Sequence, residues 1–157
     1  MLTYNYSIEE LNKIMNDNYG SLHLRSQKIL ELPEDLHVTG NMDLSFSEIK
    51  SLPKGLEVDG DLILYYTKID ELPELLTVRG NLILSHSTII SLPKYLFVGR
   101  ILDISFTSIR RFNIGLRVGQ EVRIDGTDLR ELSHDYKIGF ATQSWKRQYD
   151  TNTCTIY

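Results

Sequence analysis

The side chains that could perform catalysis or bind a metal ion are few and lie far apart in this chain. It contains four histidines and one cysteine. No cysteine, aspartate or glutamate lies beside a histidine at the spacing that metal sites use. Cys154 could act as a nucleophile only next to a general base, and the sequence places none there. We therefore expect an inert thiol, no catalytic residue, no metal and no cofactor. The histidines are His23, His37, His86 and His134.

A second set of distinctive residues is aromatic and recurs at intervals of twenty residues. Two interpretations stay open. The rings stack on one another and only shield an edge of the fold, or they form a binding face, since exposed aromatic clusters often carry interface energy. With two isoleucines expected to point outward beside them, the rings would make a larger apolar patch than solubility requires. The candidate partner-binding residues are Phe46, Ile63, Tyr65, Tyr66, Ile83, His86 and Phe106.

A repeat of twenty residues positions these side chains. Counting repeat positions 1 to 20 from residue 21, positions 2, 4, 9, 12, 16 and 18 are apolar or aromatic in all six copies. A fixed period of this length is typical of a solenoid, in which each unit buries its apolar face only by stacking on its neighbours. The third copy supplies Leu62, Leu64, Ile69, Leu72, Leu76 and Val78, and the last copy supplies Val122, Ile124, Leu129, Leu132, Tyr136 and Ile138.

The spacing within one copy predicts two extended segments joined by a turn. Leu62 and Leu64 alternate with a period of two, as do Leu76 and Val78, and this is the period of a strand. Prolines follow position 12 in the first four copies, where a missing donor is tolerated. A glycine occupies position 20 in the early copies and position 19 in the later ones, so we expect the corner to change geometry along the chain.

This pattern, LxLxxTxIxxLPxxLxV, resembles a leucine-rich repeat over residues 21 to about 140. It is similar to the short LP-type repeats of bacterial effectors and of phage and gut-bacterial proteins. The resemblance implies a leucine-rich-repeat-like solenoid that binds a protein on the face holding positions 3, 5 and 6. The family's asparagine position is hydroxylic or glutamine here, so we expect no asparagine ladder at that position. The curvature stays open between a horseshoe and a flatter β-solenoid. The matching residues are Leu62, Leu64, Thr67, Ile69, Leu72 and Pro73.

Charged residues at two repeat positions alternate in sign. Position 8 begins with Lys28, Glu48 and Lys68, and position 14 alternates glutamate and lysine over four copies. Equivalent positions in stacked coils lie roughly 4.8 Å apart, so alternating signs avoid repulsion between neighbours. The alternation therefore indicates coils stacked in register.

Each end of the solenoid requires a capping element, because an open end exposes the hydrophobic core. Ser7 and Glu10 fit a capping box, and apolar residues at helical spacing follow, which predicts a helix from about 8 to 17. The tail either folds back as a cap or is held by a partner. We expect a capping helix in residues 1–20, a six-coil solenoid in 21–140 and a cap or tail in 141–157. The residues that could cover the last coil are Phe140, Trp145, Tyr149 and Ile156.

Composition narrows the class of function. The chain has 157 residues, suited to one domain, and a net charge of −4, which does not indicate a general nucleic-acid surface. No signal peptide or stretch of about 18 apolar residues is visible, and one cysteine favours the reducing cytoplasm. We expect a non-enzymatic protein-binding module. The resemblance suggests a bacterial or phage inhibitor of a host factor or defence system, in the host cytoplasm if phage-encoded. The alternative is a structural component of a larger assembly such as a virion.

Overall fold

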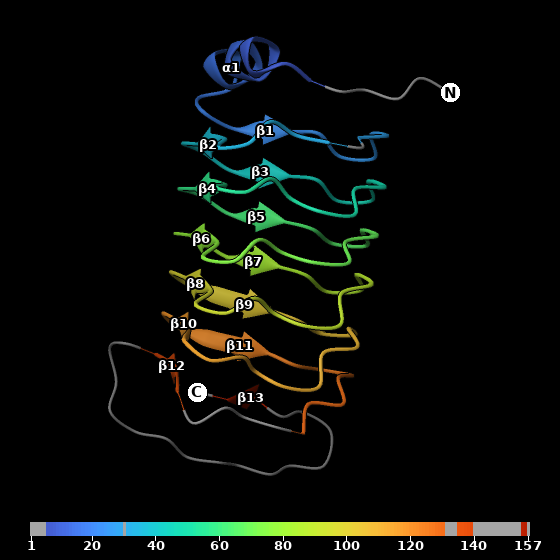
Figure 1. The fold of residues 1–157 in the computed structure, drawn as a ribbon, viewed down its shortest axis with the longest axis vertical. Coiled ribbons are helices and arrows are strands. Elements are labelled where there is room, and N and C mark those ends of the chain that lie inside the picture. The colour runs from blue at the N-terminus through green and yellow to red at the C-terminus, as the bar shows by residue number, and fades with distance from the viewer. Residues whose placement is uncertain (1–5, 30, 131–134, 140–154, 157) are drawn as a thin grey trace.

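The computed structural model describes residues 6–29, 31–130, 135–139 and 155–156. The chain winds into a parallel β-solenoid of six coils, with one short helix at its N-terminal end (Figure 1). Paired strands are offset by twenty residues, as in the pairing of Leu22 with Met42. The solenoid and its period, predicted from the spacing of apolar residues, are confirmed.

Each coil contributes one short strand to each of two sheets. The first sheet holds β1, β3, β5, β7, β9, β11 and β13 in that order, and the second holds β2, β4, β6, β8, β10 and β12. All described pairings are parallel except that of β13, which lies antiparallel to β11. The first-sheet strands are β1 (Leu22–His23), β3 (Met42–Asp43), β5 (Leu62–Ile63), β7 (Leu82–Ile83), β9 (Ile101–Asp103), β11 (Glu121–Arg123) and β13 (Thr155–Ile156). The second-sheet strands are β2 (His37–Val38), β4 (Glu57–Val58), β6 (Thr77–Val78), β8 (Phe97–Val98), β10 (Leu116–Val118) and β12 (Tyr136–Ile138).

The helix α1 (Ile8–Asp17) lies across the first coil (Figure 1). The Ser7 backbone N–H donates to Glu10 Oε2 at 2.8 Å, and the Glu10 backbone N–H donates to Ser7 Oγ at 3.2 Å. The predicted capping box and helix are therefore confirmed. Leu11 and Met15 are buried and join the core, so the helix covers the open end of the solenoid. Among the described residues, none lies in a helix with the length and apolar character needed to cross a membrane.

The core is one column of stacked apolar side chains that runs the length of the solenoid. The six inward repeat positions are buried throughout the first five coils. In the sixth coil Leu129 and Tyr136 are only partly buried, and Leu132 lies outside the described residues. The aromatic residues expected to cover this coil, including Trp145, also lie outside them, although the backbone of β13 pairs beside β11.

A ladder of side-chain oxygens at repeat position 1 links the first coils, and the sequence did not lead us to expect it. The Asp61 backbone N–H donates to Asn41 Oδ1 at 2.8 Å, and the Asn81 backbone N–H donates to Asp61 Oδ1 at 2.7 Å. Each oxygen lies over the glycine at position 20 of its own coil. A Cβ on Gly60 would come within 2.2 Å of Asn41 Oδ1. The last bond of the ladder is donated by the Ile101 backbone N–H to Asn81 Oδ1 at 3.1 Å. The ladder ends there because the isoleucine side chain has no acceptor for the next coil.

Beyond this point the glycine moves one position earlier, as the sequence predicted for the corner. A Cβ on Gly99 would meet the Arg79 carbonyl oxygen at 2.0 Å, and a Cβ on Gly119 would meet the Gly99 carbonyl oxygen at the same distance. At the later corners the glycine therefore packs on backbone alone, whereas at the earlier corners it packs on a side-chain oxygen as well as on backbone.

The predicted alternation of charge at position 8 is confirmed as a chain of ion pairs. Glu48 lies 3.8 Å from Lys28 and 3.3 Å from Lys68, each one coil away. At position 14 the carboxylate of Glu74 instead accepts the backbone N–H of Lys94 at 3.0 Å. Exposed pairs of this kind stabilise a protein by up to about 1 kcal/mol, so their main effect is on register.

Candidate functional site

The candidate site begins with a tight turn at repeat positions 4 to 7, directly after each first-sheet strand. The backbone N–H of position 7 donates to the carbonyl of position 4, at 3.3 Å for Thr67 to Leu64. The third residue of the turn has a positive φ, as in a type II turn, where glycine is preferred. Aromatic residues occupy this place in four consecutive coils. Their φ angles are 59° for Phe46, 55° for Tyr66, 59° for His86 and 56° for Phe106.

Two sets of hydrogen bonds hold this left-handed conformation in place. The position-7 hydroxyls of four coils donate to the carbonyl of position 4, at 2.8 Å from Thr67 and 2.6 Å from Ser87, whereas Ser47 Oγ is buried with no hydrogen-bond partner. The backbone N–H of position 6 donates to the next coil, for example from Tyr66 to Ser85 at 3.2 Å. A left-handed residue other than glycine costs about 1–2 kcal/mol, so the surrounding bonds must impose the conformation.

The four aromatic side chains form one continuous stack, which we call the aromatic stack: Phe46, Tyr66, His86 and Phe106. Successive ring centroids lie 5.7, 4.8 and 4.6 Å apart, and the interplanar angles are 9°, 9° and 11°. These distances approach the strand spacing of about 4.7–4.9 Å, because each coil supplies one ring. The stacking predicted from the sequence is therefore present.

The stack has a distinct end at each side. The guanidinium carbon of Arg25 lies 4.8 Å from the centre of the Phe46 ring, within range of a cation–π interaction. At the other end the Phe106 ring covers Gly126, where an added Cβ would lie 2.5 Å from Phe106 Cδ1. Neither end was identified from the sequence, although Arg25 and Gly126 occupy the flanking coils at positions 5 and 6.

Tyr65 supports the stack from its side. Its half-buried ring meets Phe46, Tyr66 and His86 edge-on, with centroids 5.4, 4.9 and 5.5 Å away. Edge-to-face contacts of this kind contribute about 0.5–1.5 kcal/mol beyond burial. Tyr65 therefore fixes three of the four stacked rings.

The two predicted isoleucines lie side by side in the first sheet. Ile63 and Ile83 are paired across β5 and β7, and both are half-buried. Asp43 and Asp103 flank them in the neighbouring strands. Each aspartate accepts a backbone N–H two residues on, from Ser45 and Ser105 respectively, at 2.9 Å. The structure thus brings all seven predicted residues into four adjacent coils, with a carboxylate on either side of the isoleucines.

The geometry limits what the aromatic stack can bind. Each ring face is occupied by the next ring, so a nucleic-acid base or a sugar cannot stack on it in the manner of single-strand binding sites. The ring edges remain accessible, and Phe46, Tyr66 and Phe106 are 43%, 51% and 56% exposed. Aromatic edges and isoleucine methyl groups offer contacts to apolar side chains.

The other chemically distinctive residues do not assemble a second site. His37 Nε2 lies 3.0 Å from Asp59 Oδ2, and Arg79 Nε lies 3.0 Å from the other carboxylate oxygen, so this cluster is an ion pair beside the second sheet. In the part of the chain that the structure describes, no group of three or more histidine, cysteine, aspartate or glutamate residues could hold a metal ion. His134 and Cys154 lie outside the described residues.

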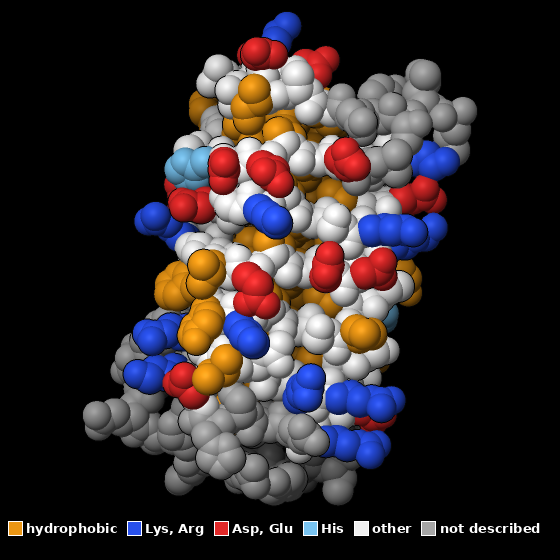
Figure 2. All heavy atoms as spheres, viewed as in Figure 1, with side chains coloured by type: hydrophobic (Ala, Val, Ile, Leu, Met, Phe, Trp, Pro, Cys, Tyr) orange, Lys and Arg blue, Asp and Glu red, His pale blue; other side chains and the backbone are white. Residues whose placement is uncertain are grey.

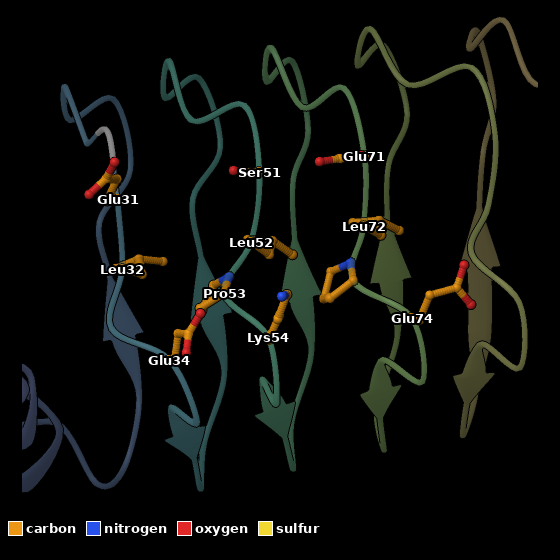
Figure 3. Close-up of a pocket in the computed structure, with 11 residues that line it drawn as sticks. Glu31, Leu32, Glu34, Ser51, Leu52, Pro53, Lys54, Glu71, Leu72 and Glu74 are labelled. Atoms are coloured by element: carbon orange, nitrogen blue, oxygen red, sulfur yellow. The ribbon is translucent and has the colours of Figure 1, made fainter.

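A shallow groove of about 740 Å³ crosses the arcs between the two sheets (Figure 3). Leu32, Leu52 and Leu72 lie side by side along it, with glutamates in rows on both sides (Figure 3). Lys54 lies within one of these rows and offsets part of the negative charge. The groove is open to solvent and contains no converging set of polar groups, so we assign it no ligand.

The chain matches no protein-family model, no curated protein and no solved structure with which it was compared. The leucine-rich-repeat resemblance therefore remains a prediction, while the β-solenoid architecture is observed directly.

Proposed function

We propose that this protein is a non-enzymatic binding module whose aromatic stack, together with Tyr65, Ile63 and Ile83, docks a protein partner. The observation that carries the proposal is the placement of four aromatic rings, three exposed and His86 half-buried, at turn positions that favour glycine. Strained backbone of this kind tends to occur at functional sites. Gly126 in the sixth coil occupies the same turn position, so the fold accepts the residue with no strain there.

The chemistry of the surface favours a protein over other partners. The ring faces are already covered, and the net charge of −4 opposes binding to a polyanion. The exposed ring edges and the two isoleucines suit an apolar segment, and the carboxylates of Asp43 and Asp103 suit cations at its two ends. A surface fixed by stacked coils loses little freedom on docking, which favours affinity.

Affinity capture from the native host, followed by mass spectrometry, tests this proposal. We expect the wild-type chain to retain a partner and the Tyr66→Ala/Ile63→Ser variant to lose it, with a tenfold or greater fall in affinity because hot-spot residues contribute about 2 kcal/mol or more. Tyr19→Ala is the matched control, since Tyr19 is also an exposed tyrosine with a positive φ but lies away from the stack. Equal capture by all three proteins would exclude the aromatic stack as the docking surface.

The biological role is a further part of the proposal. The resemblance to repeats of bacterial effectors and phage proteins supports an inhibitor of a host factor or defence system that acts in the cytoplasm. Recovery of one host protein with the wild-type chain would support this role. Stoichiometric presence of the chain in purified particles would support the alternative, a structural component of a larger assembly.

A further inference from the structure

Four large hydrophobic side chains are exposed on the arcs between the sheets, away from the aromatic stack. Leu75, Ile90, Tyr95 and Ile114 are 70%, 67%, 54% and 44% exposed, and they come from the third, fourth and fifth coils. Figure 2 shows hydrophobic side chains of this kind on both sides of one face, in its lower half. We call the surface formed by repeat positions 10 to 15 of these three coils the arc face. Large exposed apolar side chains gathered on one face are a common feature of interaction surfaces.

Two of these side chains stand, like the stacked rings, where glycine suits the backbone better. Leu75 and Tyr95 have φ angles of 63° and 57° at repeat position 15. Gly55 and Gly115 adopt the same left-handed conformation at this position in neighbouring coils. The Tyr95 ring covers Gly115, where an added Cβ would lie 2.3 Å from Tyr95 Cδ1. The arc face therefore retains bulky apolar groups in spite of local strain.

Charges on the arc face are arranged with opposite signs about the fourth coil. At positions 10 and 11 the third coil carries Asp70 and Glu71, the fourth carries Ile90 and Ser91, and the fifth carries Arg110 and Arg111. All six side chains are exposed. Within the described residues no ion pair involves any of the four charged ones. Figure 2 shows acidic side chains above and basic side chains gathered at the lower right of this face.

The geometry points to a second copy of this chain as the occupant, and we propose that the arc face forms an antiparallel homodimer. In a two-fold interface residue i contacts residue j, and j contacts i. A two-fold axis that lies in the interface, parallel to the fourth coil, reverses the order of coils and keeps the repeat positions aligned. The third coil of one copy then faces the fifth coil of the other, so the Asp70–Glu71 pair meets the Arg110–Arg111 pair twice.

The same operation brings three of the four exposed apolar groups against apolar groups of the other copy, and it places Ile114 opposite Glu74. Ile90 and Tyr95 lie on the fourth coil, so each meets its own counterpart at the axis. Leu75 on the third coil faces position 15 of the fifth coil, where the Tyr95 ring covers the buried Gly115, so Leu75 meets the exposed side of this apolar ring. A two-fold axis parallel to the solenoid axis, through the middle of the arc face, would instead align like coils and reverse the repeat positions, so neither acidic pair would meet a basic pair.

Two contacts between like charges remain in this arrangement, and each has a local counter-charge. Lys94 meets its own counterpart, but the Glu74 carboxylate accepts the Lys94 backbone N–H at 3.0 Å and lies beside it. Lys50 faces Arg130, and Arg130 lies 3.8 Å from Asp128. The four matched pairs of acidic and basic residues lie nearer the axis than the contact between Lys50 and Arg130.

Charge reversal followed by mixing tests the pairing. We expect sedimentation equilibrium to show a concentration-dependent dimer for the wild-type chain and a monomer for Asp70→Lys/Glu71→Lys and for Arg110→Glu/Arg111→Glu. An equimolar mixture of the two variants restores a dimer, because each arc face then carries one sign only and the two signs match. Glu57→Lys/Arg117→Glu is the control, since both residues are exposed on the second sheet outside the arc face, and it dimerises like the wild type.

Circular dichroism on each variant shows that it is folded, so that loss of dimer is not loss of fold. A wild-type chain that stays monomeric up to about 1 mM, where binding is weaker than about −4 kcal/mol, overturns the proposal. So does a dimer that survives both reversals, or a mixture that stays monomeric.

Cross-linking tests the orientation independently of charge. In a Cys154→Ser background, Ser91→Cys places a thiol on the fourth coil at the axis, and oxidation gives a covalent dimer. Ser51→Cys, at the same repeat position two coils away, is the control and gives none, because an antiparallel partner presents its sixth coil there. Efficient cross-linking by both variants, or by neither, indicates a different arrangement of the two copies, so each result overturns the proposal. The aromatic stack lies on a different edge of the coil and stays open in this dimer.

Discussion

At the scale of single residues, the least expected feature is the conformation of the aromatic side chains. Phe46 and Tyr66 carry φ angles of 59° and 55°, in the region that L-residues avoid because Cβ approaches the following carbonyl. Hydrogen bonds to the neighbouring coils determine this conformation. Favourable contacts between the stacked rings offset part of the backbone strain. The stability of an aromatic residue at position 6 therefore depends on two opposed contributions: backbone strain, which destabilises the fold, and ring stacking, which stabilises it.

This balance predicts an inverted order of stability at residue 66. Tyr66→Gly loses two stacked contacts worth about 0.5–1.5 kcal/mol each, but it also removes a left-handed residue that costs about 1–2 kcal/mol. Tyr66→Ala loses the same contacts and keeps the strain. Glycine gains about 0.5–1 kcal/mol more chain entropy on unfolding than alanine, which offsets part of the strain that it removes. We therefore expect the glycine variant to be more stable than the alanine variant by about 0.5–1 kcal/mol, measured by urea unfolding. An alanine variant of equal or higher stability would show that the turn relaxes out of the left-handed region.

At the scale of the elements, short strands alone do not hold the coils in register. Most strands contain two residues, so few ladder bonds join each pair. The position-1 side-chain oxygens extend the ladder through the corner, and the glycines at position 20 leave room for them. Ion pairs at position 8, beyond the turn that follows each first-sheet strand, also link neighbouring coils. Register thus depends on contacts at the corners as much as on the strands.

Substitution of a corner glycine tests this. Gly60→Ala places a Cβ 2.2 Å from Asn41 Oδ1 and 2.6 Å from the Gly40 carbonyl oxygen, and the second contact is with backbone that cannot turn aside. We expect a loss of about 1–3 kcal/mol in the free energy of unfolding, as for overpacked sites. Glu57→Ala, at an exposed site on β4, is the control and changes stability by less than about 0.5 kcal/mol. A Gly60→Ala variant as stable as this control would mean that the corner is not close-packed.

At the scale of the whole molecule, the solenoid is a stack in which each coil contacts its neighbours. Its core is continuous from the helix α1 to the sixth coil, and burial is most complete in the middle. Repeat proteins of this kind have stabilities that sum over repeats and interfaces between them. Damage to a central coil therefore removes two interfaces, whereas damage at an end removes one.

Two substitutions at adjacent residues test the inward and outward assignment. Leu64 is fully buried and Ile63 is half-buried on the outward side of the same strand segment. Leu64→Asp leaves an unpaired buried charge, which costs about 3–5 kcal/mol or more and should unfold the central coils. Ile63→Asp keeps its charge at the surface and should leave the fold intact. Far-ultraviolet circular dichroism and size-exclusion chromatography measure both, and a folded Leu64→Asp variant would contradict the assignment.

The sequence by itself determined the period, the inward positions, the capping helix and the register charges. These features follow from the pattern of burial. The pattern repeats every twenty residues because each coil has the same surroundings as the coil before it. The aromatic stack could also be predicted, since residues twenty apart at one position must lie about one strand spacing from each other. The seven candidate residues were thus placed together by periodicity alone.

Only the tertiary structure decided the conformations and ends of these features. The positive φ of Tyr66 depends on hydrogen bonds to another coil, and no local preference of tyrosine indicates it. The position-1 ladder depends on how close Asn41 Oδ1 lies to the backbone of the next coil, and this distance cannot be read from the spacing of residues in the sequence. Periodicity fixes which side chains meet, whereas the three-dimensional packing fixes how they meet and what remains exposed.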